Sequence, residues 1–186
     1  MSIASELRLT NADLEAAPED GNRYEVIDGE LFMSGPPAYT HQATLVNIVV
    51  GLHNYLSQYP IGEILPGVGV IFDDYTGVIP DLIFITNERL RKTLKGGRFH
   101  GAPEIIIEIL SPGESNERRD RYVKRSLYAA RGVAEYWLVD PENQTVEFYR
   151  RNQADELVFD QSILENDELT SSLLPNFSVR VDTLFV

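Results

Sequence analysis

The sequence predicts an α+β fold with α/β-like alternation, in which a mixed β-sheet is flanked by helices within a single domain. Helical and strand patterns interleave along the chain, and hairpin signals occur near both ends. The length of 186 residues suits one domain, and no repeat or linker-like tract divides it. We expect residues 1–22 to form an N-terminal helical extension, with Thr10 capping its short helix, and residues 23–186 to form the core.

In the first half of the core, an Asp-Gly pair at residues 28–29 lies between two apolar runs, which predicts a β-hairpin. Apolar residues at helical spacing predict the first long helix over residues 40–59. Strand-like runs follow at residues 63–72 and 78–85. Together these elements supply one helix and several strands of the expected sheet.

The second half contains the most apolar segment of the chain. Residues 104–110 (EIIIEIL) form an almost unbroken β-branched run, which is typical of a buried central strand. A short basic helix is expected before this strand and a second long helix after it, ending at Gly132. The remaining patterns predict a hairpin and short tail strands. We expect the short basic helix over residues 86–95 and the second long helix over residues 117–131. The two strands of the hairpin are expected over residues 134–139 and 145–149.

Composition excludes several kinds of site. The chain has no cysteine, so it has no disulfide, thiolate zinc site, iron–sulfur cluster or thiol nucleophile. Its three histidines are too few for a histidine-rich metal site. No apolar run is long enough to span a membrane, and the first residues lack the pattern of a secretory signal. We therefore expect a cytoplasmic protein with no membrane partner.

The charge distribution is uneven. The formal net charge of −13 argues against non-specific binding of nucleic acid. Residues 86–131, however, contain eleven Lys or Arg against six Asp or Glu, a local net charge of +5. This basic segment is either a solvated helical face or a surface that follows a nucleic-acid backbone.

Two acidic residues interrupt strand-like apolar runs. Glu108 lies within the predicted central strand, and Asp81 lies within the preceding one. A buried carboxylate is unfavourable unless it is paired, so each residue either faces solvent, forms a salt bridge or binds a cation. If the two strands are neighbours, both acids can point into one pocket and share Mg²⁺ or Mn²⁺. Glu104, at the start of the central strand, is expected to be structural.

The second long helix carries Asp120, Lys124 and Tyr128 at spacings of four residues, so these side chains share one helical face. The Asp120–Lys124 pair is either a surface ion pair or part of a site in which Lys124 leans over the end of the Glu108 strand. The short connection between this strand and the helix allows the second arrangement.

The segments YEVIDGEL, PDLIFI, GAPEIIIEILSP, DRYVKRSLY and GVAEYWLVDP resemble, in order and spacing, the Uma-two family of restriction-endonuclease-like proteins. The resemblance runs from about Arg23 to near the end of the chain. It implies a restriction-endonuclease-like fold of the PD-(D/E)XK nuclease superfamily and Mg²⁺-dependent hydrolysis of phosphodiesters. Asp81 would be the first metal ligand, Glu108 the second acid, and Ile109 would offer its backbone carbonyl to the same ion.

The chain departs from the superfamily pattern at Leu110, where a lysine is normal. A lysine on the next helix is a known variation, and Lys124 fits it. Three residues are possible auxiliary groups: Glu30 as a further acid, His41 facing the site, and Asp120 holding Lys124. A surface position for Glu30 and a packing role for His41 are the alternatives.

The function expected from this resemblance is a Mg²⁺- or Mn²⁺-dependent endonuclease with DNA as the favoured substrate. Basic residues from residues 86–131 would contact the nucleic acid, and the protein would act as a homodimer. The alternative is an inactive binding or dimerisation module whose 134–149 hairpin pairs edge to edge with a second copy. The expected nucleic-acid contacts are Arg91, Lys92, Lys95, Arg98 and Arg121.

Overall fold

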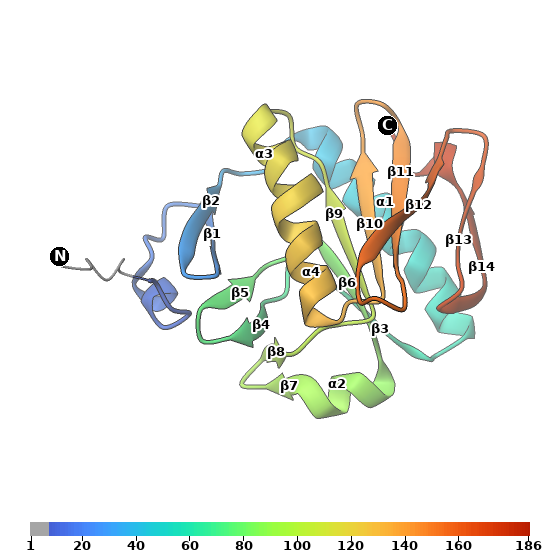
Figure 1. The fold of residues 1–186 in the computed structure, drawn as a ribbon. Helices are drawn as coiled ribbons and strands as arrows, with labels where there is room; N and C mark the ends of the chain where they lie inside the picture. Colours follow the sequence, from blue (N-terminus) through green and yellow to red (C-terminus); the bar gives the residue numbers. More distant parts are fainter. Residues whose placement is uncertain (1–7) are drawn as a thin grey trace, which may run out of the picture.

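Strand β9 (Ile105–Ile109) lies inside a six-stranded mixed sheet in the computed structural model, which describes residues 8–186. All five of its residues are buried, as the apolar run predicts. It pairs in parallel with β10 and antiparallel with β6, and the sheet order is β12-β11-β10-β9-β6-β3 (Figure 1). The other strands of this central sheet are β3 (Gly62–Pro66), β6 (Leu82–Thr86), β10 (Glu135–Asp140), β11 (Thr145–Arg151) and β12 (Leu157–Ile163).

The structure has a second six-stranded sheet, in the order β2-β1-β5-β4-β8-β7, in addition to the central sheet. The sequence predicted only one sheet. The second sheet is antiparallel except for the β4–β8 pair. The β1–β2 hairpin turns at Asp28 and Gly29, which both have positive φ, so the Asp-Gly prediction is confirmed. The strands are β1 (Arg23–Ile27), β2 (Glu30–Ser34), β4 (Val70–Asp73), β5 (Thr76–Val78), β7 (Leu94–Lys95) and β8 (Arg98–His100).

Two predicted strands are each divided between the sheets. The chain leaves the central sheet after β3, passes Gly67 at φ +60° and continues as β4 in the second sheet. It returns through β5 and a short link to β6. Asp81 therefore lies in the link that enters β6 and not within a strand.

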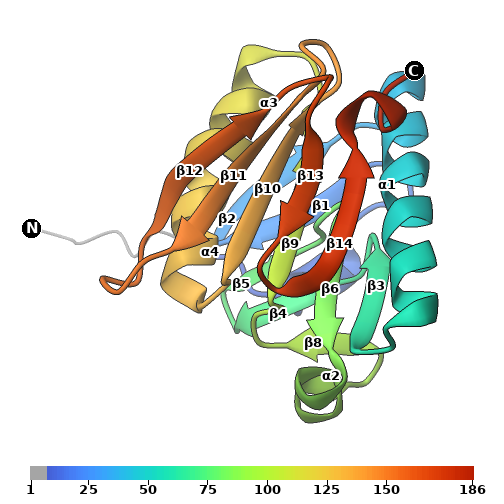
Figure 2. The same cartoon turned by 90° about the vertical axis from the view of Figure 1, so that its right-hand side faces the viewer.

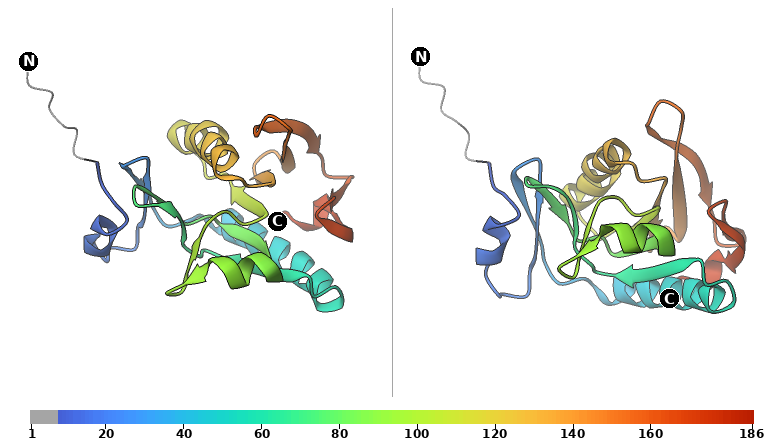
Figure 3. Two further views of the ribbon diagram at one scale, coloured as in Figure 1. Left: turned by 60° about the horizontal axis from the view of Figure 1, so that its bottom comes forward. Right: turned by 90° about the horizontal axis from the view of Figure 1, so that it is seen from below.

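Helices cover both faces of the central sheet. Helix α1 (Tyr39–Gln58) lies on one face beside the β13–β14 hairpin (Glu168–Ser171 and Leu174–Arg180), as Figure 2 shows. The other face carries one helical stretch with three parts (Figure 3). These parts are α3 (Glu114–Arg118), the π-helical η2 (Arg119–Lys124) and α4 (Arg125–Arg131).

The predicted end of the second helix is confirmed, because Gly132 follows α4 in the left-handed conformation. The short basic helix is α2 (Asn87–Thr93), which Thr86 caps by accepting a hydrogen bond from the Arg89 amide. No helix within the described part of the chain is both long and apolar enough to cross a membrane.

Two apolar clusters pack on opposite faces of the central sheet. Leu52 of α1 and Trp137 of β10 belong to one cluster, and Tyr136 and Leu127 belong to the other. Neighbouring residues of β10 point to opposite faces, as the period of a strand requires. Tyr136 and Trp137 are thus core residues, as their strand position suggested.

Two predictions, one about the N-terminal extension and one about the β10–β11 hairpin, need correction. The described part of the extension contains only a short 3₁₀ helix, η1 (Asp13–Ala16), and residues 1–7 lie outside the described chain. Thr10 does not cap η1, because its hydroxyl donates to the Asp13 carboxylate. The β10–β11 hairpin also has no open edge, since β9 and β12 pair with its two sides. Edge-to-edge dimerisation through this hairpin is therefore excluded.

Candidate active site

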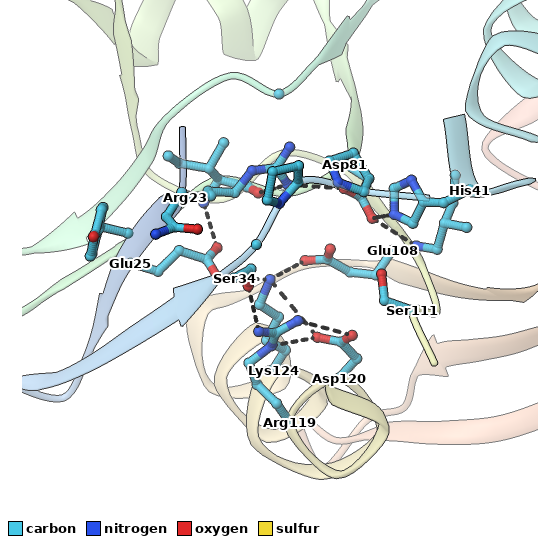
Figure 4. Close-up of a pocket in the computed structure, with 18 of the residues that line it drawn as sticks. Arg23, Glu25, Ser34, His41, Asp81, Glu108, Ser111, Arg119, Asp120 and Lys124 are labelled. Carbon is cyan, nitrogen blue, oxygen red and sulfur yellow. Dashed lines mark hydrogen bonds and ion pairs between the residues drawn. The ribbon is translucent and has the colours of Figure 1, made fainter. Parts of the chain in front are cut away.

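A pocket of about 410 Å³ opens at the end of the central sheet where β9 finishes (Figure 4). The start of β1, the end of β2, the link before β6, the end of β9 and the segment η2 all contribute to its wall. Its lining is strongly polar and draws on segments far apart in the sequence. The charged or ionisable side chains are Arg23, Glu25, His41, Asp81, Glu108, Arg119, Asp120 and Lys124.

Asp81 is held at one side of this pocket. Its Oδ1 accepts a hydrogen bond from Arg23 Nη1 (2.9 Å), and its Oδ2 accepts one from the Ile109 backbone amide (2.9 Å). The same Oδ2 lies 3.1 Å from His41 Nε2. Burial disfavours the charged carboxylate, but His41, the Ile109 amide and Lys124 outweigh burial and lower the pKa of Asp81. Asp81 is therefore ionised and fixed in position.

Glu108 is buried between Asp81 and Lys124 (Figure 4). Its Oε1 accepts hydrogen bonds from Lys124 Nζ (3.0 Å) and from the Tyr128 hydroxyl (2.6 Å). Burial raises the pKa of Glu108 to about 8, because the neighbouring carboxylates add to the effect of burial and the Lys124 ammonium only partly opposes it. This carboxyl therefore gives up its proton readily only when a further cation arrives.

Lys124 supplies a buried ammonium group to the pocket. Its Nζ lies 3.0 Å from Glu108 Oε1, 3.1 Å from Glu25 Oε2 and 4.0 Å from Asp120 Oδ1. Burial opposes the charge of Lys124, but these carboxylates outweigh burial and raise its pKa above the ordinary value. The Asp120–Lys124 pair is not the surface ion pair that the spacing alone allowed.

The π-helical segment η2 presents three of the pocket residues. Arg119 directs its Nε to Asp120 Oδ1 (3.0 Å) and its Nη1 to Ser34 Oγ (2.7 Å), which joins the helix to the end of β2. Asp120 and Lys124 are both buried within the same segment. Local π geometry is frequent at functional sites, and the sequence spacing did not predict it here.

The auxiliary role predicted for Glu30 is wrong, because this residue is exposed at the β1–β2 turn. The acid that reaches the pocket is Glu25 of β1, which is 1% exposed. Its Oε1 accepts a hydrogen bond from the Ile79 amide (2.7 Å), and its Oε2 contacts Lys124. The sequence contains a signal for Glu25, because it is an acid within an apolar strand, as Glu108 is.

The predicted nucleic-acid contacts do not gather at this pocket. Helix α2 and strands β7 and β8, which carry four of them, lie at the other end of β6 and β9 (Figure 1). Arg121 is paired with Glu147 and lies close to Glu117 and Asp140. The four residues at the far end are Arg91, Lys92, Lys95 and Arg98.

The donor chemistry of the pocket fits a single Mg²⁺ or Mn²⁺ ion. The lining has four carboxylates, three basic side chains and one histidine, a formal charge of −1 with the histidine neutral. The described residues contain no cluster of three or more side chains arranged as a ready metal site. Mg²⁺ needs no such cluster, because it is usually held by one or two carboxylates, with water and substrate phosphate completing its shell. Asp81, Glu108 and the carbonyl of Ile109 can supply those oxygen atoms.

A mixed sheet that carries two acids and a lysine in one pocket at its end agrees with the arrangement that the sequence resemblance implies. A family model described as "Uma2: Putative restriction endonuclease" matches residues 12–182. The chain therefore belongs to the Uma2 family, and this membership supports a nuclease function. No curated protein matches the chain.

A similar fold is found in a solved structure, a putative nuclease belonging to DUF820 from Anabaena variabilis ATCC 29413. The TM-score is 0.74 at 22% sequence identity, over 95% of this chain and 97% of that one. The type IIG restriction endonuclease BpuSI gives a TM-score of 0.46 at 15% identity, over 85% of this chain and 17% of that one. The first likeness shows that this chain and the DUF820 protein share one fold over nearly their whole lengths.

Proposed function

We propose that the protein is a Mg²⁺-dependent endonuclease that hydrolyses phosphodiester bonds in DNA. One observation carries the proposal: Asp81, Glu108 and Lys124, which come from three separate elements, line the same buried pocket. Two acids that share a pocket support a role in binding a cation, because two ionised carboxylates close together repel each other. Mn²⁺ has the same preference for oxygen ligands and should substitute.

Each residue has a defined part in the proposed reaction. Asp81, Glu108 and the Ile109 carbonyl hold Mg²⁺, which supplies positive charge for the phosphoryl group when bound. Lys124 orients the attacking water or contacts the scissile phosphate, because its charge is held in place before the reaction. Glu25 and Asp120 position the Lys124 ammonium, and His41 positions Asp81. The cytoplasmic location of the protein and its homodimeric state stay predictions.

Cleavage of DNA by purified variants tests this function. With Mg²⁺ or Mn²⁺, the wild type is expected to nick or cut DNA, and D81N and E108Q to abolish cleavage. We expect K124M to lower the rate by about 10²–10³-fold, the effect of removing one preorganised donor. E104Q is the matched control, because it removes a carboxylate from just before the same strand but outside the pocket.

Equal cleavage by wild type, D81N and E108Q would mean that a contaminant is responsible and that the proposal is wrong. Far-ultraviolet circular dichroism of each variant separates loss of chemistry from loss of folding. Absence of cleavage and of Mg²⁺ binding in the wild type would favour the inactive nuclease-fold module.

A further inference from the structure

The three basic side chains in the pocket differ in how many of their donors are already used. Lys124 is 2% exposed and is surrounded by carboxylates. Arg119 uses all three of its nitrogens, since Nε and Nη2 donate to Asp120 and Nη1 donates to Ser34. Every side-chain nitrogen of these two residues is therefore already held by at least one polar partner.

Arg23 is different. Only its Nη1 is engaged, and it donates to the Ile79 carbonyl (3.1 Å) and to Asp81 Oδ1 (2.9 Å). Its Nε and Nη2 make no hydrogen bond to any residue that the structure describes, and neither is among the buried unpartnered atoms of those residues. With 33% of the side chain exposed, these donors are open to solvent.

The position of Arg23 places these donors at the edge of the pocket. Arg23 is the first residue of β1 and pairs with Ser34, the last residue of β2, so it lies at the open end of the hairpin. Figure 4 shows Arg23, Asp81 and His41 along one side of the pocket, with Arg119 and Lys124 opposite. The guanidinium of Arg23 therefore lies beside Asp81 on the same side of the pocket.

We propose that Arg23 is the substrate-binding residue of this pocket and that its Nε and Nη2 donate to a backbone phosphate of the nucleic acid. An arginine fork matches two phosphate oxygens, and one half of this fork is already fixed by Ile79 and Asp81. The inference rests on the proposed nuclease function, and it assigns the phosphate contact to this pocket and not to the basic residues of α2.

Binding without cleavage tests the role of Arg23. The affinity of E108Q for a labelled DNA oligonucleotide, single-stranded and duplex, is measured by fluorescence anisotropy at several salt concentrations. The double variant E108Q/R23Q is compared with E108Q/R150Q. Arg150 is a matched control, because it is 34% exposed and is paired with a buried carboxylate, Glu135, but lies outside the pocket.

We expect R23Q to weaken binding about tenfold, since it removes a charge-assisted contact. It should also reduce the slope of log affinity against log salt by about 0.7–0.9, the value for one phosphate. R150Q should change neither quantity. The change in slope is decisive, because a residue that only positions Asp81 would leave the number of phosphate contacts unchanged.

Two results would overturn the inference. One is an unchanged affinity and salt slope in R23Q, which would leave Arg23 as a positioning residue for Asp81. The other is failure of E108Q itself to bind either oligonucleotide at low salt. The proposed nuclease function is decided separately by wild-type cleavage, so DNA cleavage with an unchanged R23Q slope would contradict only the inference about Arg23.

Discussion

Two glutamates four residues apart, one just before β9 and one within it, have opposite surroundings. Glu104 lies just before the strand, where its Oε2 accepts from the Thr86 amide (3.0 Å) and its Oε1 from the Thr86 hydroxyl (2.8 Å). Arg89 also contacts Oε1 (3.1 Å). Glu108 lies at the pocket, with hydrogen bonds to Oε1 alone among the described residues. Both glutamates belong to the same apolar motif, so the sequence pattern around them is similar.

The difference separates a carboxylate that joins structural elements from one that we propose binds a metal ion. Both oxygens of Glu104 are used to join β9 to β6 and to the start of α2, away from the pocket. Glu108 is buried with one oxygen unused, an unfavourable state unless another ligand is bound. For these two glutamates, the position at the pocket and the unused acceptor atom, and not burial or charge alone, mark the difference.

The largest difference in stability between the two ends of β9 should come from K124M. The substitution leaves buried carboxylates without their cation, so we expect the free energy of unfolding to fall by about 3–5 kcal/mol. R89M removes the cation beside Glu104, where the arginine side chain is 38% exposed, and should lower stability by less than about 1 kcal/mol. Urea unfolding measures both. Equal losses would mean that the two ends of β9 are equivalent.

A second effect should appear in the dependence of stability on pH without metal. Folding raises the pKa of Glu108 from its ordinary 4.5 to about 8, so between these values the folded protein holds a proton that the unfolded chain has released. Stability should therefore fall as pH rises from about 5 to 8, because the unfolded chain releases this proton and the folded protein keeps it. Thermal unfolding should show this fall in wild type and E104Q but not in E108Q.

Asp81 should act in the opposite direction at lower pH. Its pKa is lowered on folding, so its contribution to stability is present above its ordinary pKa of 3.8 and is lost as pH falls further. The metal-free protein is expected to be most stable at mildly acidic pH. A stability maximum at pH 8 or above without metal would contradict the assigned state of Glu108.

Metal binding should be coupled to proton release for the same reason. An ion that binds the ionised form of Glu108 must displace its proton below about pH 8, so the apparent Mg²⁺ affinity should rise from pH 6 to 8. Calorimetric titration in buffers of different ionisation enthalpy counts the released protons. E108Q should release none, and E104Q should behave as wild type. Release of the same number by E108Q would assign the proton to another group.

A small effect on stability, and none on metal binding, is expected from E104Q. This change weakens charge-assisted hydrogen bonds at a partly exposed carboxylate, so we expect a loss of about 1 kcal/mol in the free energy of unfolding. Mg²⁺ binding and DNA cleavage should be unchanged. A loss of Mg²⁺ affinity in E104Q would remove the distinction between the two ends of β9.

Much of the site could be predicted because its central residues violate local patterns. Glu108 interrupts a core strand, and Asp81 precedes another apolar run, so each is visible without knowledge of the fold. The helical spacing of Asp120 and Lys124 placed them on one face, which the structure confirms. The central strand, the β1–β2 hairpin and the boundary at Gly132 also follow from local sequence chemistry.

The missed features depend on contacts between distant segments. Arg23 and Glu25 enter the pocket only because β1 belongs to a second sheet, which forms when the chain turns away after β3. Glu25 interrupts an apolar strand as Glu108 does, but only its contacts with Ile79 and Lys124 show that it reaches the pocket. The basic residues of α2 were grouped with the site by sequence position, although β6 and β9 separate them from it.

The most direct test is the anomalous difference map of a crystal soaked in Mn²⁺. The account requires one Mn²⁺ ion between the carboxylates of Asp81 and Glu108, with oxygen ligands at about 2–2.5 Å. The same soak of E108Q should lose this peak. Mn²⁺ bound only outside the pocket, or a wild-type pocket that stays empty at millimolar Mn²⁺, would contradict the central claim that these two acids share a metal ion.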